Sequence, residues 1–172
     1  MARTPSLSVF AAVSAFALLA ACSGGAGNGA EETAEETAAP AGDAPAEIKQ
    51  RQDNFEAIGD SFKAIREQLE TDAPDFAVIT PAAADINERL KRLPDLFPAG
   101  SSMEAGYDTE ALAVIWEDPE GFAKAIENGI AASEDMMAAA ATGDPEAVRG
   151  QVGNLGKNGC KACHDKYRVD DD

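Results

Sequence analysis

Two cysteines and a histidine lie close together near the end of the sequence, in the segment Cys160-Lys161-Ala162-Cys163-His164. His164 is the only histidine in the chain, and the one further cysteine is Cys22, far away along the sequence. Such a cluster serves three kinds of chemistry in proteins: a redox-active dithiol, a zinc site or a covalently attached haem. Each of these requires different surroundings, so the remainder of the sequence discriminates among them.

The first 21 residues have the pattern of a cleaved export signal. Arg3 supplies a positive charge, and the apolar run that follows, from Val9 to Ala21, is too short to span a bilayer comfortably. The run ends in Leu19-Ala20-Ala21-Cys22, which resembles the lipobox of bacterial lipoproteins, whose cysteine takes a diacylglyceryl group. An ordinary signal peptide with an incidental Cys22 is the alternative. Both interpretations place the mature protein outside the cytoplasm, and the first tethers it to a membrane from the periplasm.

Residues 22–45 are predicted to form a flexible acidic linker. The stretch is rich in Gly, Ala, Thr, Glu and Pro and has no aromatic or large aliphatic residue. Residues 46–172 have a length that suits one domain with one core. Acidic residues outnumber basic ones by 31 to 14, which gives a formal net charge of -17 at pH 7. Because such a surface repels nucleic acid and anionic lipids, we expect no nucleic-acid partner and membrane contact only through the lipid anchor.

Apolar residues at steps of three and four predict four amphipathic helices. The helices are expected over about 46–70, from 76 to Pro94 with Pro81 inside, from Pro119 to Gly143, and from Pro145 through Cys163. Asp118 and Asp144 each precede a Pro-Glu pair, as N-cap residues do at a helix start. Four such helices, joined by two short links and one long loop at about 94–115, predict an all-α antiparallel four-helix bundle.

These helical surroundings favour haem over the other two kinds of site. A thioredoxin-like dithiol lies where a strand meets a helix, and this domain has no alternating strand pattern. A structural zinc site usually has four protein ligands, whereas the motif supplies three once Cys22 is acylated. The pattern C-x-x-C-H is the attachment motif of c-type haem, which forms outside the cytoplasm, where the export signal sends the chain. We therefore predict one covalent haem c on Cys160 and Cys163, with His164 as the axial iron ligand.

With this motif at the end of the last of four helices, the chain resembles the class II cytochromes c, and in particular the cytochrome c prime family. The segments that carry the resemblance are RQDNFEAIGDSFKAI from residue 51, RLPDLFPAGS from residue 92, VIWEDPEGF from residue 114 and CKACHDKYR from residue 160. The resemblance covers the whole domain from about 46 to 170. It implies a haem-binding four-helix bundle, in agreement with the periodicity.

The resemblance also implies roles for residues outside the motif. Phe55 matches the position over the distal haem face, on the side opposite His164. Arg51 and Gln52 match residues near the haem propionates, although an arginine that is only a solvated surface charge is the alternative for Arg51. Arg168 matches a basic residue near the proximal face.

The iron is expected to be five-coordinate and high-spin, with His164 as its only axial ligand. A low-spin branch of class II takes its sixth ligand from a methionine of the first helix, and the helix expected at 46–70 contains no methionine. The ring of Phe55 cannot coordinate iron. The methionines of the domain, at positions 103, 136 and 137, are expected to fill gaps in the core.

For function, the resemblance implies binding of nitric oxide and carbon monoxide, with transfer of single electrons as a second role. A plain periplasmic electron carrier that docks a basic redox partner protein is the alternative. We expect no enzyme of the peroxidase type, because His164 is committed to the iron and no second histidine can serve as a distal acid or base. The resemblance also permits a homodimer through the helices at 46–70 and 76–94.

Lipidation at Cys22 can be tested directly. We expect the mature protein to be released from membranes only by detergent, and Cys22→Ser to appear in the soluble fraction because it lacks the acyl chains. Fractionation followed by haem staining measures the partition. If Cys22→Ser stayed equally membrane-bound, the lipobox interpretation would be wrong.

Overall fold

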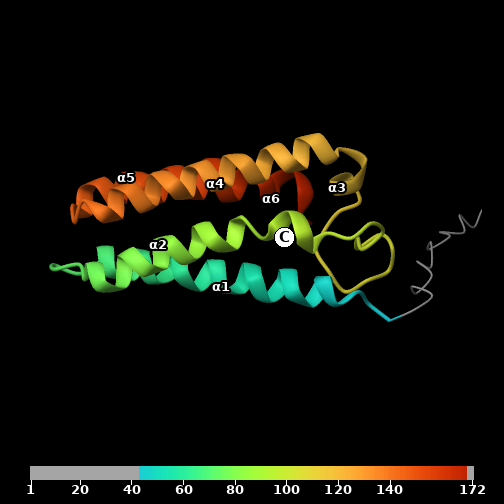
Figure 1. The fold of residues 1–172 in the computed structure, drawn as a ribbon, viewed down its shortest axis with the longest axis horizontal. Helices are drawn as coiled ribbons and strands as arrows, with labels where there is room; N and C mark the ends of the chain where they lie inside the picture. The colour runs from blue at the N-terminus through green and yellow to red at the C-terminus, as the bar shows by residue number, and fades with distance from the viewer. Residues whose placement is uncertain (1–42, 170–172) are drawn as a thin grey trace, which may run out of the picture. The chain divides into compact units, whose positions relative to one another are not determined.

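The structure is a computed structural model that describes residues 43–169 (Figure 1). The export signal at 1–21, Cys22 and the linker up to residue 42 lie outside the described residues, so their assignments stay predictions. Within 43–169, no helix combines the length and the apolar character that a membrane span requires.

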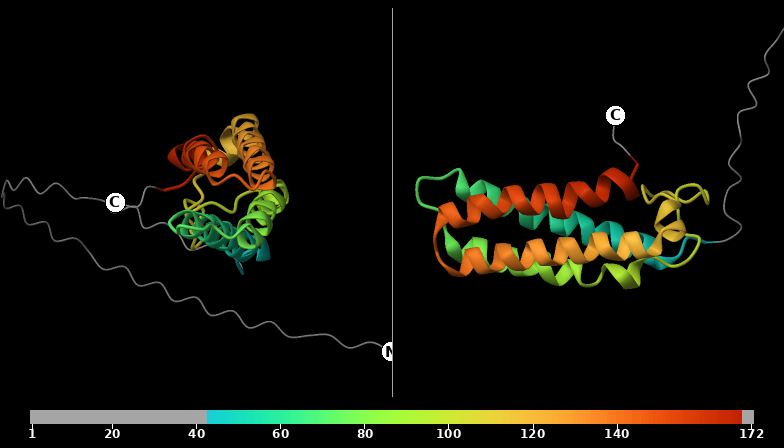
Figure 2. Two further views of the ribbon diagram at one scale, coloured as in Figure 1. Left: turned by 90° about the vertical axis from the view of Figure 1, so that its left-hand side faces the viewer. Right: turned by 90° about the horizontal axis from the view of Figure 1, so that it is seen from above.

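Four long helical segments lie side by side in the described part of the chain (Figures 1 and 2). They are α1 (Ala46–Leu69), α2 (Phe76–Leu90), α4 (Pro119–Ala141) and a fourth segment made of α5 (Pro145–Asn154), the π-helix η2 (Leu155–Lys161) and α6 (Ala162–Tyr167). Between α2 and α4 the chain forms the 3-10 helix η1 (Leu93–Leu96) and the single turn α3 (Val114–Glu117). The predicted all-α four-helix bundle is confirmed.

Side-chain caps explain where the last two segments begin. The carboxylate of Asp118 accepts a hydrogen bond from the backbone N–H of Gly121 at 3.1 Å, and that of Asp144 accepts one from Glu146 at 2.9 Å. Beyond the end of α4, after its C-cap residue Thr142, Gly143 has a φ of 70°, a left-handed conformation that is unstrained for glycine. Both starts and the stop between them agree with the sequence prediction.

The second helix differs from the prediction at its end. α2 continues through Pro81 as predicted, but it ends at Leu90 rather than near Pro94. The chain then tightens into η1, whose first two residues are Leu93 and Pro94. A proline ring disfavours the α conformation of the residue before it, which explains the change to a tighter turn. The single turn α3 was not predicted either.

The core consists of two clusters of buried apolar side chains. The larger cluster runs between α1, α2, α4 and the fourth segment, and Met136 at its centre is completely buried. The smaller cluster lies toward η1 and α3 and includes Phe122 and Tyr167, whose rings meet edge to face at 5.1 Å. Cys160 packs against the larger cluster and Cys163 against the smaller one. The motif therefore lies where the two clusters meet.

The π-helix η2 replaces a stretch that was predicted as regular α-helix. Its wider turn runs directly into the motif. The buried residues Leu155, Gly159 and Tyr167, with half-buried Cys163 between the last two, are separated by steps of four. A four-residue step overshoots an α-helical turn of about 3.6 residues by roughly 40°. The wider turn removes part of this drift, and so keeps the motif on the side of the helix that faces the bundle.

Two glycines allow α4 and η2 to approach closely. Gly129 and Gly159 are both buried, and a Cβ atom on Gly159 would lie 3.4 Å from the Cα of Gly129. The same Cβ would lie 2.9 Å from a methyl group of Leu155, closer than such atoms pack. This contact comes one residue before Cys160, so it sets the distance of the motif from α4.

A second contact ties the end of α6 to the start of α4. The carboxylate of Asp118 accepts hydrogen bonds from the ammonium of Lys166 at 2.6 Å and from the hydroxyl of Tyr167 at 3.2 Å. A Cβ atom on Gly121 would collide with this carboxylate and lie 2.6 Å from the Tyr167 hydroxyl. The hydrogen bond from Lys166 lowers the pKa of Asp118 and raises the pKa of Lys166. Folding therefore favours the charged form of both side chains.

The glycine contact generates a prediction about stability. We expect Gly159→Ala to lower the free energy of unfolding by about 1–3 kcal/mol, because the added methyl group overpacks the interface between α4 and η2. Gly153→Ala is the matched control, since a Cβ there meets nothing within 4 Å. It should be neutral or stabilising by up to about 1 kcal/mol, as alanine is in a helix. Chemical denaturation measures both, and a shift of both midpoints in the same direction would contradict the contact.

The ion pair generates a prediction about acid sensitivity. Because the pKa of Asp118 is lowered, its stabilising contribution is complete above the ordinary value of 3.8 and is lost as the pH falls through the folded value. Asp118→Asn keeps the cap, since asparagine caps a helix as well as aspartate does, but it loses the ion pair with Lys166. Its unfolding midpoint should therefore fall less on acidification below about pH 4 than that of the wild type. If the unfolding midpoints of the two proteins fell equally on acidification, the ion pair of Asp118 with Lys166 would not be a source of the acid sensitivity.

Candidate functional site

The two thiols of the motif are held in their neutral form. Cys160 lies near the end of the π-helix, Cys163 lies in α6, and both are free thiols with half-buried side chains. Burial raises the pKa of Cys160, and burial together with the neighbouring Cys160 raises the pKa of Cys163 to about 11. A redox-active dithiol requires the opposite, a lowered thiol pKa. Within residues 43–169, no three His, Cys, Asp or Glu side chains gather to hold a metal ion, so a zinc site has no support either.

α1 presents an aromatic ring to the histidine of the motif. The rings of Phe55 and His164 meet edge to face, with their centroids 6.3 Å apart and an interplanar angle of 77°. Phe55 is one of the few large apolar side chains that solvent reaches, with 36% of its surface exposed. The structure thus brings together two residues that lie far apart in the sequence and that the resemblance placed on opposite haem faces. That placement stays a prediction.

The chemistry of the donor set fits a covalently bound haem c. Cys160 and Cys163 are two thiols in one helical turn, and both pack against apolar clusters, as a porphyrin edge requires. They would hold the haem through two thioether bonds, while His164 would offer its imidazole to the iron. When bound, the haem supplies an iron atom that takes up small ligands and exchanges single electrons.

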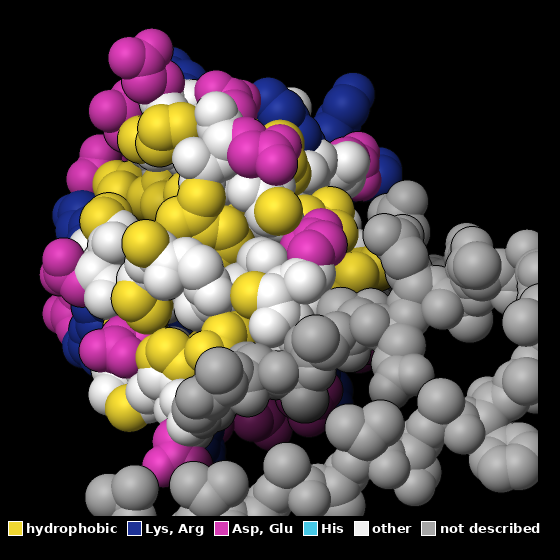
Figure 3. Space-filling model, turned by 90° about the vertical axis from the view of Figure 1, so that its right-hand side faces the viewer, with side chains coloured by type: hydrophobic (Ala, Val, Ile, Leu, Met, Phe, Trp, Pro, Cys, Tyr) yellow, Lys and Arg dark blue, Asp and Glu magenta, His cyan; other side chains and the backbone are white. Residues whose placement is uncertain are grey.

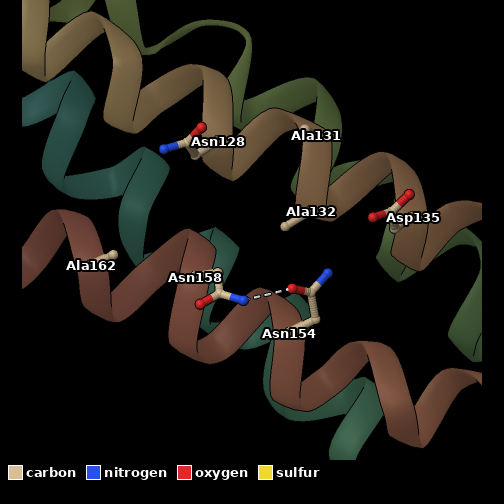
Figure 4. A pocket seen from close by; sticks show the side chains of 7 residues that line it. All are labelled: Asn128, Ala131, Ala132, Asp135, Asn154, Asn158 and Ala162. Carbon is tan, nitrogen blue, oxygen red and sulfur yellow. Dashed lines mark hydrogen bonds between the residues drawn. The ribbon is translucent and has the colours of Figure 1, made fainter.

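A surface groove runs between α4 and the fourth segment, beside the motif (Figure 4). It consists of two hollows of about 390 Å³ and 240 Å³ that share Asn128, Asn158 and Ala162. Cys163 lines the smaller hollow, whereas Phe55 and His164 line neither. The groove therefore reaches one attachment point of the motif but not the contact between the Phe55 and His164 rings.

Arg51 is not the solvated surface charge that the sequence left open as an alternative. Only 2% of its surface is exposed. Its guanidinium donates hydrogen bonds to the Ser101 hydroxyl at 2.8 Å and carbonyl at 2.5 Å, and to the Thr109 hydroxyl at 2.9 Å. Burial lowers the pKa of Arg51. Its predicted proximity to the haem propionates stays a prediction, and no signal in the sequence indicated Ser101 or Thr109 as partners.

The other two polar residues implied by the resemblance also contact the long loop. The side chain of Gln52 is exposed and donates a hydrogen bond to the carbonyl of Asp108 at 3.0 Å. Arg168 follows α6 directly and forms an ion pair with Glu110 at 3.2 Å. Their roles on the propionate and proximal sides stay predictions. The three methionines differ: Met136 is in the larger core cluster and Met137 packs against it, as expected, whereas Met103 is 38% exposed.

Similar proteins include ones named cytochrome c' and ones named cytochrome c-554. A cytochrome c-554 from Cereibacter sphaeroides is 40% identical over 98 residues, which are 56% of this chain and 72% of the relative. Residues 46–168 match the family profile of cytochrome c'. A cytochrome c' from Rubrivivax gelatinosus is 33% identical over 121 residues, which are 70% of this chain and 92% of the relative. The structure of cytochrome c' from Shewanella frigidimarina aligns with a TM-score of 0.65 at 32% identity, over 72% of this chain and 94% of that one.

Two further structures of similar proteins record ligand behaviour. One is a nitric oxide complex of a mutant cytochrome c' from Alcaligenes xylosoxidans, with a TM-score of 0.63 and 25% identity over 72% of this chain and 94% of that one. The other is a cytochrome c' with ligand-controlled dimer dissociation, with a TM-score of 0.67 and 27% identity over 72% of this chain and 95% of that one. Since the family match spans the whole bundle together with its C-x-x-C-H motif, the chain belongs to the cytochrome c' family and carries covalent haem c.

Proposed function

We propose that this protein captures nitric oxide, and also binds carbon monoxide, at a five-coordinate, high-spin haem iron. Transfer of single electrons is its second proposed role. A lipid anchor on Cys22 would hold it at a membrane from the periplasmic side. No enzymatic reaction is proposed, because His164 is the only histidine of the chain and serves as the iron ligand.

The observation that supports this proposal is the edge-to-face contact between the rings of Phe55 and His164. A phenyl ring has no lone pair to donate to iron, and α1 contains no methionine or histidine that could replace it. A side chain that occupies the space without bonding to the metal leaves the sixth coordination position to an external ligand. This arrangement supports the proposal of five-coordinate iron.

The same residue favours nitric oxide over dioxygen. Dioxygen gains from a hydrogen-bond donor near the iron, because negative charge develops on it when it binds. Phe55 offers no such donor, and nitric oxide needs none. The nitric oxide complex of the relative from Alcaligenes xylosoxidans supports this choice of gas.

A homodimer through α1 and α2 is part of the proposal. Val78 on α2 is 37% exposed, which is unusual for a large apolar side chain in this bundle. The similar cytochrome c' with ligand-controlled dimer dissociation supports both the dimer and its link to ligand binding. Size-exclusion chromatography with light scattering, with and without carbon monoxide, tests this part.

A plain electron carrier is the second candidate, and the excess of acidic over basic residues favours it. A chain with 31 acidic and 14 basic residues presents a surface that suits a basic redox partner. The optical spectrum of the ferrous protein separates the two functions. A gas-binding site should change its spectrum on addition of carbon monoxide, whereas a carrier with closed six-coordinate iron should barely respond.

Substitution of Phe55 gives the sharpest test. We expect Phe55→Ala to bind carbon monoxide at least about tenfold more tightly, equivalent to about 1.4 kcal/mol, because an entering ligand no longer has to displace the ring. Phe55→Met should act in the opposite direction, since its thioether can close the site and turn the spectrum low-spin. Optical titration with carbon monoxide measures the affinity of both variants.

Phe76→Ala is the matched control for the loss of a ring. Phe76 packs against the larger core cluster from the start of α2, so its removal should lower stability without changing the carbon monoxide affinity by more than about twofold. If Phe55→Ala had the affinity of the wild type, Phe55 would not control access to the iron.

A further inference from the structure

The long loop between α2 and α4 is attached to α1 through Arg51. We call residues 96–112 of this loop the strap. The Arg51 guanidinium donates hydrogen bonds to the Ser101 hydroxyl and carbonyl and to the Thr109 hydroxyl, and it reaches the carbonyl of Leu96 at 3.4 Å. It also lies over the ring of Phe97, 4.9 Å from the ring centre. The Arg51 side chain therefore contacts the strap at three places: at Leu96 and Phe97, at Ser101 and at Thr109.

The other end of the strap is attached to the chain that follows His164. The backbone N–H of Leu112 donates to the carbonyl of Tyr167 at 3.1 Å, and that of Val169 donates to the carbonyl of Glu110 at 3.0 Å. Ala111 and Arg168 form an antiparallel bridge between these hydrogen bonds. The strap thus joins α1 to the end of α6 across the end of the bundle, where Figure 2 shows the loop between the two helices.

Thr109 connects the two attachments. Its hydroxyl oxygen accepts hydrogen bonds from Arg51 at 2.9 Å and from the backbone N–H of Ala111 at 3.3 Å. Ala111 is in turn the residue that bridges to Arg168. A continuous series of contacts therefore leads from Arg51, one helical turn before Phe55 on α1, to the residue one turn after His164.

Arg51 contributes a buried cation to this attachment. Among residues 43–169 no carboxylate pairs with it, and its hydrogen-bond acceptors are neutral oxygens of the strap. Burying a cation among neutral groups is costly. A planar guanidinium offers five donors in a fixed fork, so it can bond several strap oxygens at once, which a lysine ammonium cannot do in the same geometry.

We propose that Arg51 and Thr109 are positioning residues that set the separation between Phe55 and His164 through the strap. The strap fixes α1 on the distal side and the end of α6 on the proximal side relative to each other. Loosening it would let the two facing rings move apart and would ease ligand access to the iron. The effect on ligand access rests on the proposed function, whereas the mechanical role of the strap does not.

Thr109→Val tests the connection between the two attachments of the strap, because valine has nearly the same shape as threonine but no hydroxyl to accept the two hydrogen bonds. In the haem-loaded protein, hydrogen exchange of the Leu112 and Val169 amides should become faster by about tenfold, as expected for loss of a hydrogen bond to a charged group. Carbon monoxide association, measured after flash photolysis, should also become faster by several-fold. Arg51→Lys keeps the charge but loses the fork, and should show the same two changes.

Two further variants separate this role from a general loss of stability. Thr109→Ser retains the hydroxyl and should restore both the exchange rates and the association rate. Thr142→Val makes the same replacement at the far end of α4, where the Thr142 hydroxyl bonds the Ala139 carbonyl, and should leave both measurements as in the wild type.

The outcomes distinguish the strap from the proposed function. If hydrogen exchange of the Leu112 and Val169 amides were unchanged in Thr109→Val, the mechanical role of the strap would be refuted. This conclusion would not depend on the carbon monoxide association rate. Faster exchange with an unchanged association rate would overturn the positioning of the rings. If the wild type bound no carbon monoxide, the proposed gas-binding function would fail, and the exchange rates would still decide whether Thr109 joins the two helices.

Discussion

The haem motif takes its position from the close approach of two backbones, those of α4 at Gly129 and of η2 at Gly159. No side chain separates the helices there, so the residues on either side share one apolar interior. Cys160 and Cys163 consequently fall where the two core clusters meet, and burial holds both thiols neutral by raising the pKa of each. The same packing that suits a porphyrin edge is unsuited to a reactive dithiol.

The end of the bundle that carries the site is held by two different electrostatic contacts. The ion pair of Asp118 and Lys166 is exposed, and pairs of this kind contribute modestly because water screens them. Arg51 is buried, and its hydrogen bonds to the strap would leave unpaired groups behind if they were lost. The first contact connects the end of α6 to the start of α4. The second connects α1 to the strap, which in turn bonds the chain at the end of α6.

Much of this arrangement follows from local sequence rules. The apolar periodicity, the caps at Asp118 and Asp144 and the C-x-x-C-H pattern predict the bundle and its cofactor, because each depends on residues within a few positions of one another. The burial of Arg51 has no such local signal, since its partners Ser101 and Thr109 lie 50 and 58 residues away in an irregular loop. The π-helix η2 was not predicted for a related reason, because the steps of four residues that favour it also fit an ordinary α-helix.

A crystal structure of the haem-loaded protein tests the central claim most directly, that Phe55 and His164 face each other across the cofactor. We predict His164 bonded to the iron on one face of the porphyrin and the Phe55 ring against the other, with no protein atom bonded to the iron there. A methionine or lysine ligand on that face would contradict the account. So would a Phe55 ring turned into solvent, away from the iron.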